Sequence, residues 1–284
     1  AGKIWVNGEL VPEEDAKLSV LDRGLHYGDG VFETLRAYNG KLFRLDEHLA
    51  RLKRSAKRLG LPRPESEEEI ELLIQLLLAK NNLVPGLYIR PLVRGGGGGL
   101  GVRDATEPTL IVAASPVGAY LKGGRLEKGV VLVISSPVRR APPGPGAAKK
   151  TGNYLSSVLA KREAKAAGAD EALLLDEDGY VTEGAGSNVF FVKGDGVLVT
   201  PPLSGGILPG ITRDSLLELA KELGLTVEER PITLEDLKQA DEVFLTNTAA
   251  GVTPVGLIDG RVGQPGPVTK KLRELLTDIQ YGEI

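Results

Sequence analysis

The sequence contains no cysteine and no methionine among its 284 residues. Without cysteine, the chain can form no disulfide bond, no thiolate metal site and no cysteine nucleophile. Its two histidines, His26 and His48, leave few candidates for a histidine-centred mechanism and make no His-rich metal signature, so we expect no metal site. A natural chain of this length would normally carry several methionines, so their absence favours an engineered, consensus or computationally redesigned sequence.

Long apolar runs and an excess of one charge are missing as well. The formal net charge is −3 with both signs interspersed, which indicates neither a nucleic-acid partner nor an anionic membrane. The most apolar run, "IELLIQLLLAK", is far shorter than the ~20 residues that span a bilayer. Because "AGKIWVNGEL" at the start has the pattern of a strand and not of a signal peptide, we expect a soluble, cytoplasmic protein.

The hydrophobic pattern predicts strands and segregated helices, an α+β protein of two domains. Hairpin turns are expected at Asn7-Gly8 and at Asn39-Gly40, because Asn-Gly is the strongest local turn signal. Ser66 and Glu69 predict a capping box at the start of a helix. Further strands are expected in 86–95, 108–117, 130–138, 171–184, 187–201, 226–232 and 241–248, and helices in 45–59, 66–83, 153–167, 212–223, 234–239 and 267–279. We place an N-terminal domain at 1–121, a linker at 122–127 and a C-terminal domain at 128–284.

The usual catalytic motifs, GxxxxGK[ST], GxGxxG after a strand and GxSxG, are absent, but lysine chemistry is possible. Lys149 and Lys150 lie between a Pro/Gly-rich segment and the start of a helix in "GPGAAKKTGNYLSS". A lysine amine forms a Schiff base with a carbonyl compound when its surroundings lower its pKa. Pyridoxal phosphate, the common cofactor of this kind, needs an acid near its pyridine nitrogen and a helix start or cation near its phosphate. A solvated turn would also explain the two lysines.

Other residues could meet these needs, although each has an ordinary structural explanation. Glu183 in "YVTEGAGSN" ends a strand, and taken alone it reads as a surface acid. The helix that starts near Thr212 has free N–H groups for an anion, but Thr212 could simply be its N-cap. Thr248 has small neighbours that expose backbone amides, whereas Arg51, four residues after Glu47, predicts a common helix ion pair.

Seven segments in order carry a resemblance to a known family. They are "DRGLHYGDGVFETLRAYNGKLFRLDEHLARL", "LYIRPLV", "GAYL", "AAKKTGNYLSSVLA", "DEALLLDEDGYVTEGAGSNVFF", "LPGITRD" and "DEVFLTNTAAGVTPV". The chain resembles the class IV, or fold-type IV, pyridoxal-phosphate aminotransferases, most closely the branched-chain amino acid aminotransferases. The resemblance implies a small α+β N-terminal domain and a larger C-terminal domain with a barrel-like mixed sheet. It also implies a homodimer or higher homo-oligomer, in which the partner's interdomain loop completes the active site.

Carried over residue by residue, the resemblance assigns the Schiff-base role to Lys149, at the first position of the family's "K-x-x-G-N-Y". Adjacent side chains of an extended backbone point to opposite faces, so Lys149 is expected to face inward and Lys150 outward. The implied cofactor contacts are Glu183 to the pyridine nitrogen, Tyr154 to the ring hydroxyl, and Arg51, Ile211 (through its N–H), Thr212 and Thr248 to the phosphate. The implied substrate contacts are Tyr27, Phe32, Tyr88, Arg90, Tyr120, Thr248, Ala249 and Ala250.

The implied reaction is transamination of leucine, isoleucine or valine with 2-oxoglutarate as acceptor, with freed Lys149 as general base and acid. Alternatives are a D-amino acid or (R)-amine transaminase of the same family, or a redesigned scaffold of low activity. D-specific relatives carry an Arg and a His two residues apart, whereas here Arg94 is followed by glycine and no histidine follows His48.

Two departures from the family pattern bear on substrate binding. The five glycines Gly95 to Gly99 lose much conformational entropy on ordering, so a lid made of them is expected to be mobile. Asn247 and Gly251 stand where the pattern usually has Gly and Glu. We expect both changes to affect substrate range and rate more than the fold or cofactor binding.

Overall fold

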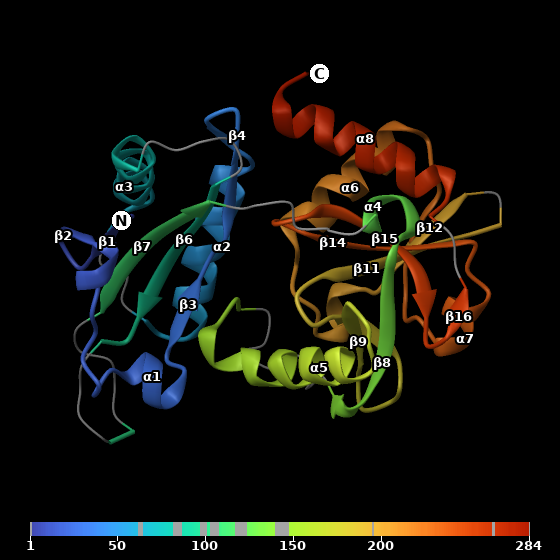
Figure 1. Cartoon of the computed structure of the whole chain (residues 1–284), viewed down its shortest axis with the longest axis horizontal. Coiled ribbons are helices and arrows are strands. Elements are labelled where there is room, and N and C mark those ends of the chain that lie inside the picture. Colours follow the sequence, from blue (N-terminus) through green and yellow to red (C-terminus); the bar gives the residue numbers. More distant parts are fainter. Residues whose placement is uncertain are drawn as a thin grey trace. The chain divides into compact units, whose positions relative to one another are not determined.

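The computed structural model describes residues 2–61, 65–81, 87–96, 101–102, 108–116, 124–139, 148–194, 196–262 and 265–283. Its contacts group the chain into two compact units (Figure 1). The N-terminal unit is Ala1–Gly118 with Ala148–Tyr154, and the C-terminal unit is Ala119–Ala147 with Leu155–Ile284. The C-terminal domain predicted from the sequence includes 148–154, and residues 122 and 123 of the predicted linker lie outside the described residues, so those domain limits stay a prediction.

The N-terminal unit contains a seven-stranded sheet in the order β2-β1-β7-β6-β4-β5, with β3 also paired to β6. The strands are β1 (Lys3–Val6), β2 (Glu9–Pro12), β3 (Gly30–Phe32), β4 (Leu35–Tyr38), β5 (Lys41–Leu42), β6 (Leu87–Arg94) and β7 (Thr109–Pro116). The helices are α1 (Arg23–Tyr27), α2 (Leu45–Arg58) and α3 (Glu67–Lys80), with 3-10 turns at Glu13–Asp15 and Thr151–Asn153.

Local sequence rules explain several of these elements. In both predicted hairpins the Asn and Gly have positive φ, as a two-residue turn requires: 44° and 100° at Asn7 and Gly8, 48° and 78° at Asn39 and Gly40. The Ser66 side chain accepts the N–H of Glu69, and the Glu69 side chain accepts the N–H of Ser66, which is the predicted capping box of α3. The short helix α1 was not predicted, because five residues are too few for a hydrophobic period.

Helix α2 buries two parallel rows of side chains. Its apolar row, which includes Leu49, Leu52 and Ala56, packs with Ile70, Ile74 and Leu77 of α3 and with the sheet. Fully burying each leucine or isoleucine contributes about 1.5–3 kcal/mol. The second buried row is polar and consists of His48, Arg51 and Ser55. Because buried polar groups need partners, this row indicates a specific polar site under the helix.

The C-terminal unit contains a nine-stranded mixed sheet in the order β10-β9-β8-β15-β14-β11-β12-β13, with β16 paired to β15. The strands are β8 (Val130–Arg139), β9 (Glu171–Leu175), β10 (Val181–Gly184), β11 (Asn188–Lys193), β12 (Val197–Thr200), β13 (Val227–Glu229), β14 (Glu242–Asn247), β15 (Gly251–Ile258) and β16 (Arg261–Val262). A bridge between Val181 of β10 and Ile232, just after β13, joins the two ends of this order. The sheet therefore curls toward closure, and the predicted α+β fold with a barrel-like sheet is confirmed.

The helices of this unit are α4 (Arg125–Lys128), α5 (Tyr154–Ala166, of which Leu155 onward belongs here), α6 (Ile211–Glu222), α7 (Leu234–Lys238) and α8 (Pro267–Tyr281). In the part of the chain that the structure describes, none of the helices has the length and apolar character to cross a membrane.

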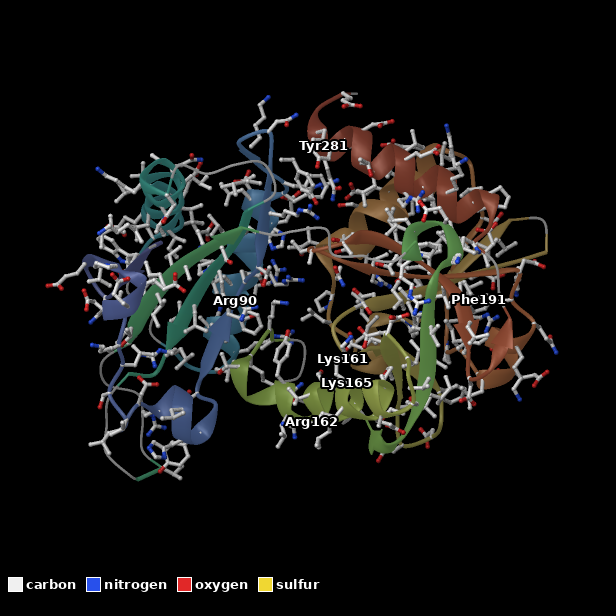
Figure 2. The ribbon with its side chains drawn as sticks, in the orientation of Figure 1. Arg90, Lys161, Arg162, Lys165, Phe191 and Tyr281 are labelled. Carbon is white, nitrogen blue, oxygen red and sulfur yellow. The ribbon has the colours of Figure 1, made fainter. Side chains whose placement is uncertain are left out.

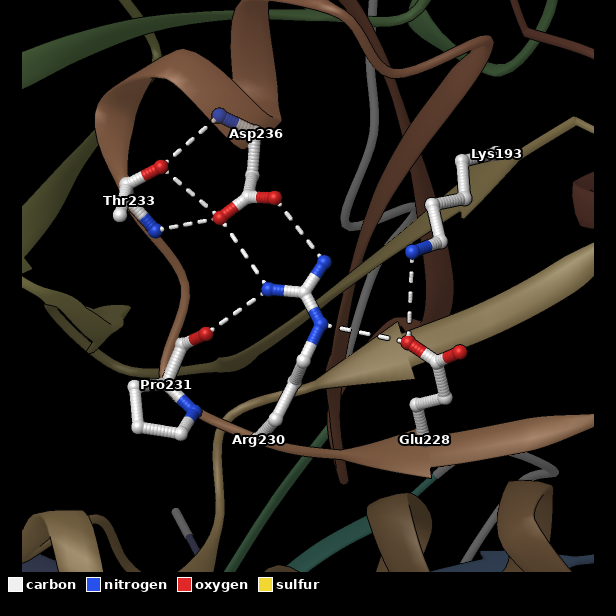
Figure 3. A network of polar contacts seen from close by, with 6 residues as sticks. All are labelled: Lys193, Glu228, Arg230, Pro231, Thr233 and Asp236. Carbon is white, nitrogen blue, oxygen red and sulfur yellow. Dashed lines mark hydrogen bonds and ion pairs between the residues drawn. The ribbon is translucent and has the colours of Figure 1, made fainter.

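A polar network ties the end of β13 to α7 and β11 (Figure 3). Arg230 pairs with Asp236 at 2.9 Å and with Glu228 at 3.2 Å, and Lys193 pairs with Glu228 at 3.4 Å. Asp236 also accepts the N–H and the hydroxyl of Thr233, the residue that caps α7. These side chains are partly exposed, so water screens each ion pair and its contribution to stability is small.

Candidate active site

The polar row of α2 meets Glu33, a fully buried carboxylate between β3 and β4. Glu33 accepts Nε and Nη2 of Arg51 at 2.7 and 2.8 Å, and Nδ1 of His48 at 2.7 Å. The expected ion pair of Arg51 with Glu47 is wrong, because Glu47 pairs instead with Arg44 at 2.9 Å. Arg51 turns inward because a side-on pair with a desolvated carboxylate is much stronger than a solvated contact on the helix surface.

This network fixes the charge of its members. Burial raises the pKa of Glu33, but the Arg51 charge and the hydrogen bonds from Arg51 and His48 outweigh it and lower that pKa to about 2. Burial lowers the pKa of His48; Glu33 opposes this, whereas Arg51 and Lys149 add to it. The imidazole is therefore neutral at pH 7, and it donates from Nδ1, because the ionised carboxylate can only accept.

The extended segment with Lys149 runs beside β3 and below α2. The N–H of Phe32 donates to the Lys149 carbonyl at 3.0 Å, and the N–H of Lys149 donates to Oγ of Ser55 at 3.0 Å. The Lys149 amine lies 4.9 Å from the centroid of the Phe32 ring and 3.5 Å from the Tyr154 hydroxyl. Lys150, which is extended at φ −108° and ψ 144° and bridges Val31, directs its side chain to the other face.

Two glycines bring this segment close to its neighbour. Gly28 has a φ of 63°, and a Cβ on it would lie 2.3 Å from Cα of Gly152. Thr151 completes the contact, since its hydroxyl donates to the carbonyl of Gly28 at 3.0 Å. Backbone-to-backbone packing of this kind sets the position of Lys149 from the main chain.

The surroundings lower the pKa of the Lys149 amine to about 8. Burial is the main cause, the positive charges of Arg51 and Arg90 act in the same direction, and Glu33 opposes them. A fraction of the amine is then neutral near physiological pH, and a neutral amine is the form that attacks a carbonyl carbon or accepts a proton.

Of the N-terminal residues predicted to bind substrate, some lie close to Lys149, and Tyr27 makes other contacts. The guanidinium of Arg90, which is labelled in Figure 2, lies 4.7 Å from the centroid of the Phe32 ring, and the Lys149 amine lies 4.9 Å from the same centroid. Tyr27 is 41% exposed on α1, where its contacts are with the His26 ring and the Arg23 guanidinium. The side chain of Tyr88 and all of Tyr120 lie outside the described residues.

The predicted glycine lid falls mostly on residues 97–100, which lie outside the described residues, so its mobility stays a prediction. Its described ends are attached to neighbouring backbone: the N–H of Gly95 donates to the Asp29 carbonyl at 2.9 Å, and the Gly96 carbonyl accepts the N–H of Arg23 at 3.0 Å. Arg94, just before the lid, is buried in an ion pair with Asp22.

Glu183 of β10 occupies a buried position in the C-terminal unit. It is 3% exposed, so the interpretation of this residue as a surface acid is wrong. Its carboxylate accepts the N–H of Leu208 at 3.1 Å, and Asn188 donates to the Leu208 carbonyl at 3.0 Å. A Cβ at Gly210 would lie 2.0 Å from Oδ1 of Asn188, so a larger residue there would displace the Asn188 side chain from its hydrogen bond to Leu208.

The start of α6 is a buried helix N-terminus without a side-chain cap. Gly210 is its N-cap, and Ile211, Thr212 and Arg213 in its first turn are all buried. Uncapped N–H groups carry partial positive charge and are suited to an anion such as phosphate. Thr212 lies inside the helix, so it is not the N-cap.

Two buried hydroxyls nearby in the fold add acceptors and donors. Thr246 pairs in register with Asn188, so both side chains share one face of the sheet. Within the described residues, Oγ1 of Thr246 and Oγ of Ser187 are buried and have no hydrogen-bond partner. Unpaired buried hydroxyls cost free energy, so the surroundings of Ser187 and Thr246 suit a bound polar ligand better than they suit a dry apolar core.

The turn after β14 holds the remaining predicted residues, Thr248, Ala249 and Ala250, all partly buried. Oδ1 of Asn247 accepts the N–H of Ala250 at 2.8 Å. The departure from the family pattern at Asn247 therefore has a local role, because its side chain closes the turn. Gly251, the other departure, begins β15.

Sequence reasoning missed Glu33, His48 and Ser55 as members of the site, and Asn188 and Leu208 beside Glu183. A signal for the first three existed. His48, Arg51 and Ser55 recur at spacings of three and four on one side of a helix whose neighbouring row is apolar. No local pattern marks Leu208, because only its backbone takes part.

The N-terminal unit holds a lysine of lowered pKa beside a buried charged network, and the C-terminal unit holds a buried acid and an uncapped helix start. Each of these features suits lysine-based chemistry with a phosphate-bearing carbonyl cofactor. Comparison with known proteins gives the family. The model of the amino-transferase class IV family matches residues 30–258, so the chain belongs to the class IV aminotransferases.

Three relatives illustrate the extent of the similarity. The chain is 49% identical to a putative branched-chain-amino-acid aminotransferase of Methanocaldococcus jannaschii, over 98% of this chain and 96% of the relative. It is 46% identical to the Escherichia coli branched-chain amino acid aminotransferase of known structure, with a TM-score of 0.94 over 100% of this chain and 96% of that one. It is also 45% identical to the T.th. branched-chain amino acid aminotransferase complexed with N-(5'-phosphopyridoxyl)-L-glutamate, with a TM-score of 0.92 over 100% and 95% of the chains.

These findings confirm two predictions from the sequence. The protein is an aminotransferase, and its cofactor is pyridoxal 5'-phosphate, which class IV aminotransferases use. Each unit by itself offers groups that suit this cofactor: an amine and a buried cation in the N-terminal unit, and a buried acid and uncapped helix-start amides in the C-terminal unit.

Proposed function

We propose that this protein transfers the amino group of L-leucine, L-isoleucine or L-valine to 2-oxoglutarate. Relatives along nearly the whole chain are named branched-chain-amino-acid aminotransferases, which supports the donor. The phosphopyridoxyl-glutamate complex of the T.th. enzyme supports a glutamate and 2-oxoglutarate pair as the second couple. The observation that carries the proposal is the Lys149 amine, held by the main chain and lowered in pKa to about 8.

The cofactor supplies an aldehyde carbon and an electron-accepting ring. We assign to Lys149 the role of holding the cofactor covalently at that carbon. Once the substrate amine has taken its place, the freed Lys149 amine would move a proton between the substrate Cα and the cofactor C4'. A pKa near the working pH suits an amine that must both accept and return a proton. Glu183 would hold a proton on the pyridine nitrogen, and Tyr154 would contact the ring hydroxyl.

The phosphate ligands in this proposal are Arg51, Thr212, Thr248 and the N–H of Ile211. Two observations, each within its own unit, support it. Arg51 is a buried guanidinium whose orientation is fixed by Glu33. Ile211 and Thr212 occupy the first turn of an uncapped, buried helix start. Both arrangements are pre-organised, so little reorganisation free energy is needed to bind a dianion.

Substrate contacts are proposed for the residues given in the sequence analysis, with Arg90 and Phe32 the best supported. Arg90 is a cation close to the reactive amine and is suited to a carboxylate, and Phe32 offers an apolar surface. The burial of Arg94 against Asp22 argues against its use as the carboxylate clamp of a D-amino acid enzyme.

We propose a homodimer as the assembly. Helix α5 exposes Leu155, Val158 and Leu159, which are 68%, 42% and 44% accessible and share one face at spacings of three and four. An apolar stripe of this kind on an otherwise charged helix is typical of a surface that another chain covers. Light scattering that gives the mass of a single chain would contradict this assignment. The cytoplasmic location stays a prediction.

The proposed function is tested with purified protein, pyridoxal 5'-phosphate and three donors. We expect visible absorbance that borohydride traps on Lys149, its loss in Lys149→Ala, and its retention in Lys150→Ala as the matched control. With 2-oxoglutarate, L-leucine should turn over, whereas D-alanine and (R)-phenylethylamine should not. Turnover of either of these with none for leucine would overturn the substrate, and no change of the bound-cofactor spectrum with any donor would indicate a scaffold of low activity.

A further inference from the structure

We propose that Glu33, supported from behind by His48, is a positioning residue that fixes the Arg51 guanidinium in the orientation in which it takes the cofactor phosphate. This inference rests on the proposed function, in which Arg51 binds the cofactor phosphate and neither Glu33 nor His48 contacts the cofactor. It concerns a carboxylate that by charge alone would repel a phosphate, so its presence beside Arg51 needs an explanation.

The geometry is that of a fixed support. Glu33 uses Oε1 for Nε of Arg51 and Oε2 for Nη2, so the pair is side-on and bidentate. Two parallel hydrogen bonds leave the guanidinium plane no freedom to rotate about its long axis. Glu33 itself is fixed, because its N–H donates to the Pro91 carbonyl at 2.9 Å and Oε2 accepts Nδ1 of His48 at 2.7 Å.

The electrostatics agree with this role. Arg51 and His48 from α2 act on the Glu33 carboxylate, and Glu33 in turn acts on the Lys149 amine. Arg90 from β6 acts on the same amine. Three of these groups are cations and His48 is neutral at pH 7. Glu33 is therefore the carboxylate that balances the buried Arg51 guanidinium and the nearby Lys149 amine before any phosphate arrives, and a buried guanidinium without such a partner would be costly.

Substitution of Glu33 has two opposite effects on phosphate binding, so the sign of the result is informative. Loss of the negative charge would strengthen phosphate binding through the unbalanced Arg51. Loss of the fixed orientation would weaken it. Because the carboxylate makes two short charge-assisted bonds, and orientation matters for a bidentate ligand, we expect the second effect to dominate.

The test compares the affinity of the apo-protein for pyridoxal 5'-phosphate with its affinity for pyridoxal, which lacks the phosphate. Wild-type protein should bind pyridoxal 5'-phosphate much more tightly, and Glu33→Gln should reduce this ratio about 10–100-fold, the range for hydrogen bonds to a charged group. Glu33→Asp, which keeps the charge but withdraws the carboxylate by one methylene, should also reduce the ratio. His48→Gln should reduce it less, since Glu33 and Arg51 remain paired.

The control is Glu47→Gln, the same change at an exposed acid of α2, the helix that carries Arg51 and His48. It should leave the ratio of the two affinities unchanged. If affinities for both ligands fall in parallel in Glu33→Gln, the residue has only a general structural role and the inference is wrong. A rise in the ratio, or an Asp variant that equals wild type, would mean that charge and not orientation matters, which also contradicts it.

Should Glu33→Gln fail to fold, the His48→Gln variant decides in the same way, with an unchanged ratio as the contrary result. Failure of the proposed function looks different. In that case wild-type protein would bind neither ligand, or would bind both equally.

Discussion

Two ion pairs in this protein have nearly the same length but lie in different surroundings. Arg51 and Glu33 in the N-terminal unit are 2.7 Å apart, with side chains 4% and 0% exposed. Arg230 and Asp236 in the C-terminal unit are 2.9 Å apart, with side chains 32% and 24% exposed. Distance alone would rank them together. Burial separates them, because water screens the second pair and leaves the first in a medium of low polarity.

The difference also separates two purposes. The Arg230 network joins a strand end to a helix cap (Figure 3), and its members could be exchanged for other polar residues at small cost. The Glu33 network keeps charges where desolvation opposes them, and a buried ion pair is seldom more stable than apolar residues of the same size. Its presence beside a reactive lysine is therefore better explained by chemistry than by stability.

Among substitutions that remove one of the two ion pairs, Arg51→Met is expected to change the free energy of unfolding most. The substitution leaves Glu33 buried without its cation, so we expect the free energy of unfolding to fall by about 3–5 kcal/mol at pH 7. Denaturant unfolding of the apo-protein measures it. Arg54→Met, at an exposed position of the same helix, is the matched control and should change the free energy by less than about 0.5 kcal/mol.

The difference in the free energy of unfolding between wild type and Arg51→Met should become smaller as the pH falls. The folded-state pKa of Glu33 is about 2 against an ordinary value of 4.5, so its contribution is present above 4.5 and is lost as pH falls through 2. The free energies of unfolding of the two proteins, measured at successive pH values between 4.5 and 2 and plotted against pH, should therefore converge. Parallel curves over this range would show that Glu33 is not the group responsible.

A smaller effect, of opposite sign, is expected from Lys149→Met. The folded-state pKa of Lys149 is about 8, below the ordinary 10.5, so protonation of the buried amine costs stability below pH 8. That cost shrinks as pH rises from 8 to 10.5, because the folded amine loses its proton first. Methionine removes it, and we expect the apo-protein to gain on the order of 1–3 kcal/mol at pH 7 and little at pH 10.5. Thermal unfolding at both pH values decides, with Lys150→Met as the control that should show no such gain.

The smallest effect belongs to Arg230→Gln. We expect a loss of less than about 1 kcal/mol at low ionic strength, and less again in about 1 M salt, where the screening length is short. The same salt series applied to Arg51→Met should leave its larger loss nearly unchanged. Equal salt dependence in the two variants would mean that the buried pair is hydrated, and burial would then not distinguish the two pairs.

Rules of short range predicted much of the fold from the sequence. Asn7-Gly8 and Asn39-Gly40 make their turns, and Ser66 with Glu69 caps α3, because each device acts within four residues. The class of enzyme and its cofactor followed from motifs in the right order. These features need no knowledge of what lies far away in the chain.

Partners across long separations could not be predicted in this way. The local rule paired Arg51 with Glu47, but its partner Glu33 lies 18 positions earlier and reaches it only after β3 has been placed under α2. Glu183 has the pattern of a solvated strand end, and its burial depends on closure of the sheet through Val181 and Ile232. Such pairings are set by tertiary packing, which overrides local preference.

The contact of Gly28 with Gly152 has a consequence for the engineering of this enzyme. The Lys149 amine is placed by main chain packed on main chain, and the hydrogen bond from Thr151 to Gly28 holds this contact. Side chains proposed to contact the substrate could therefore be randomised in directed evolution without displacing Lys149, whereas any side chain at Gly28 would collide with the main chain of Gly152. The specificity of the protein should be far easier to alter than its reaction.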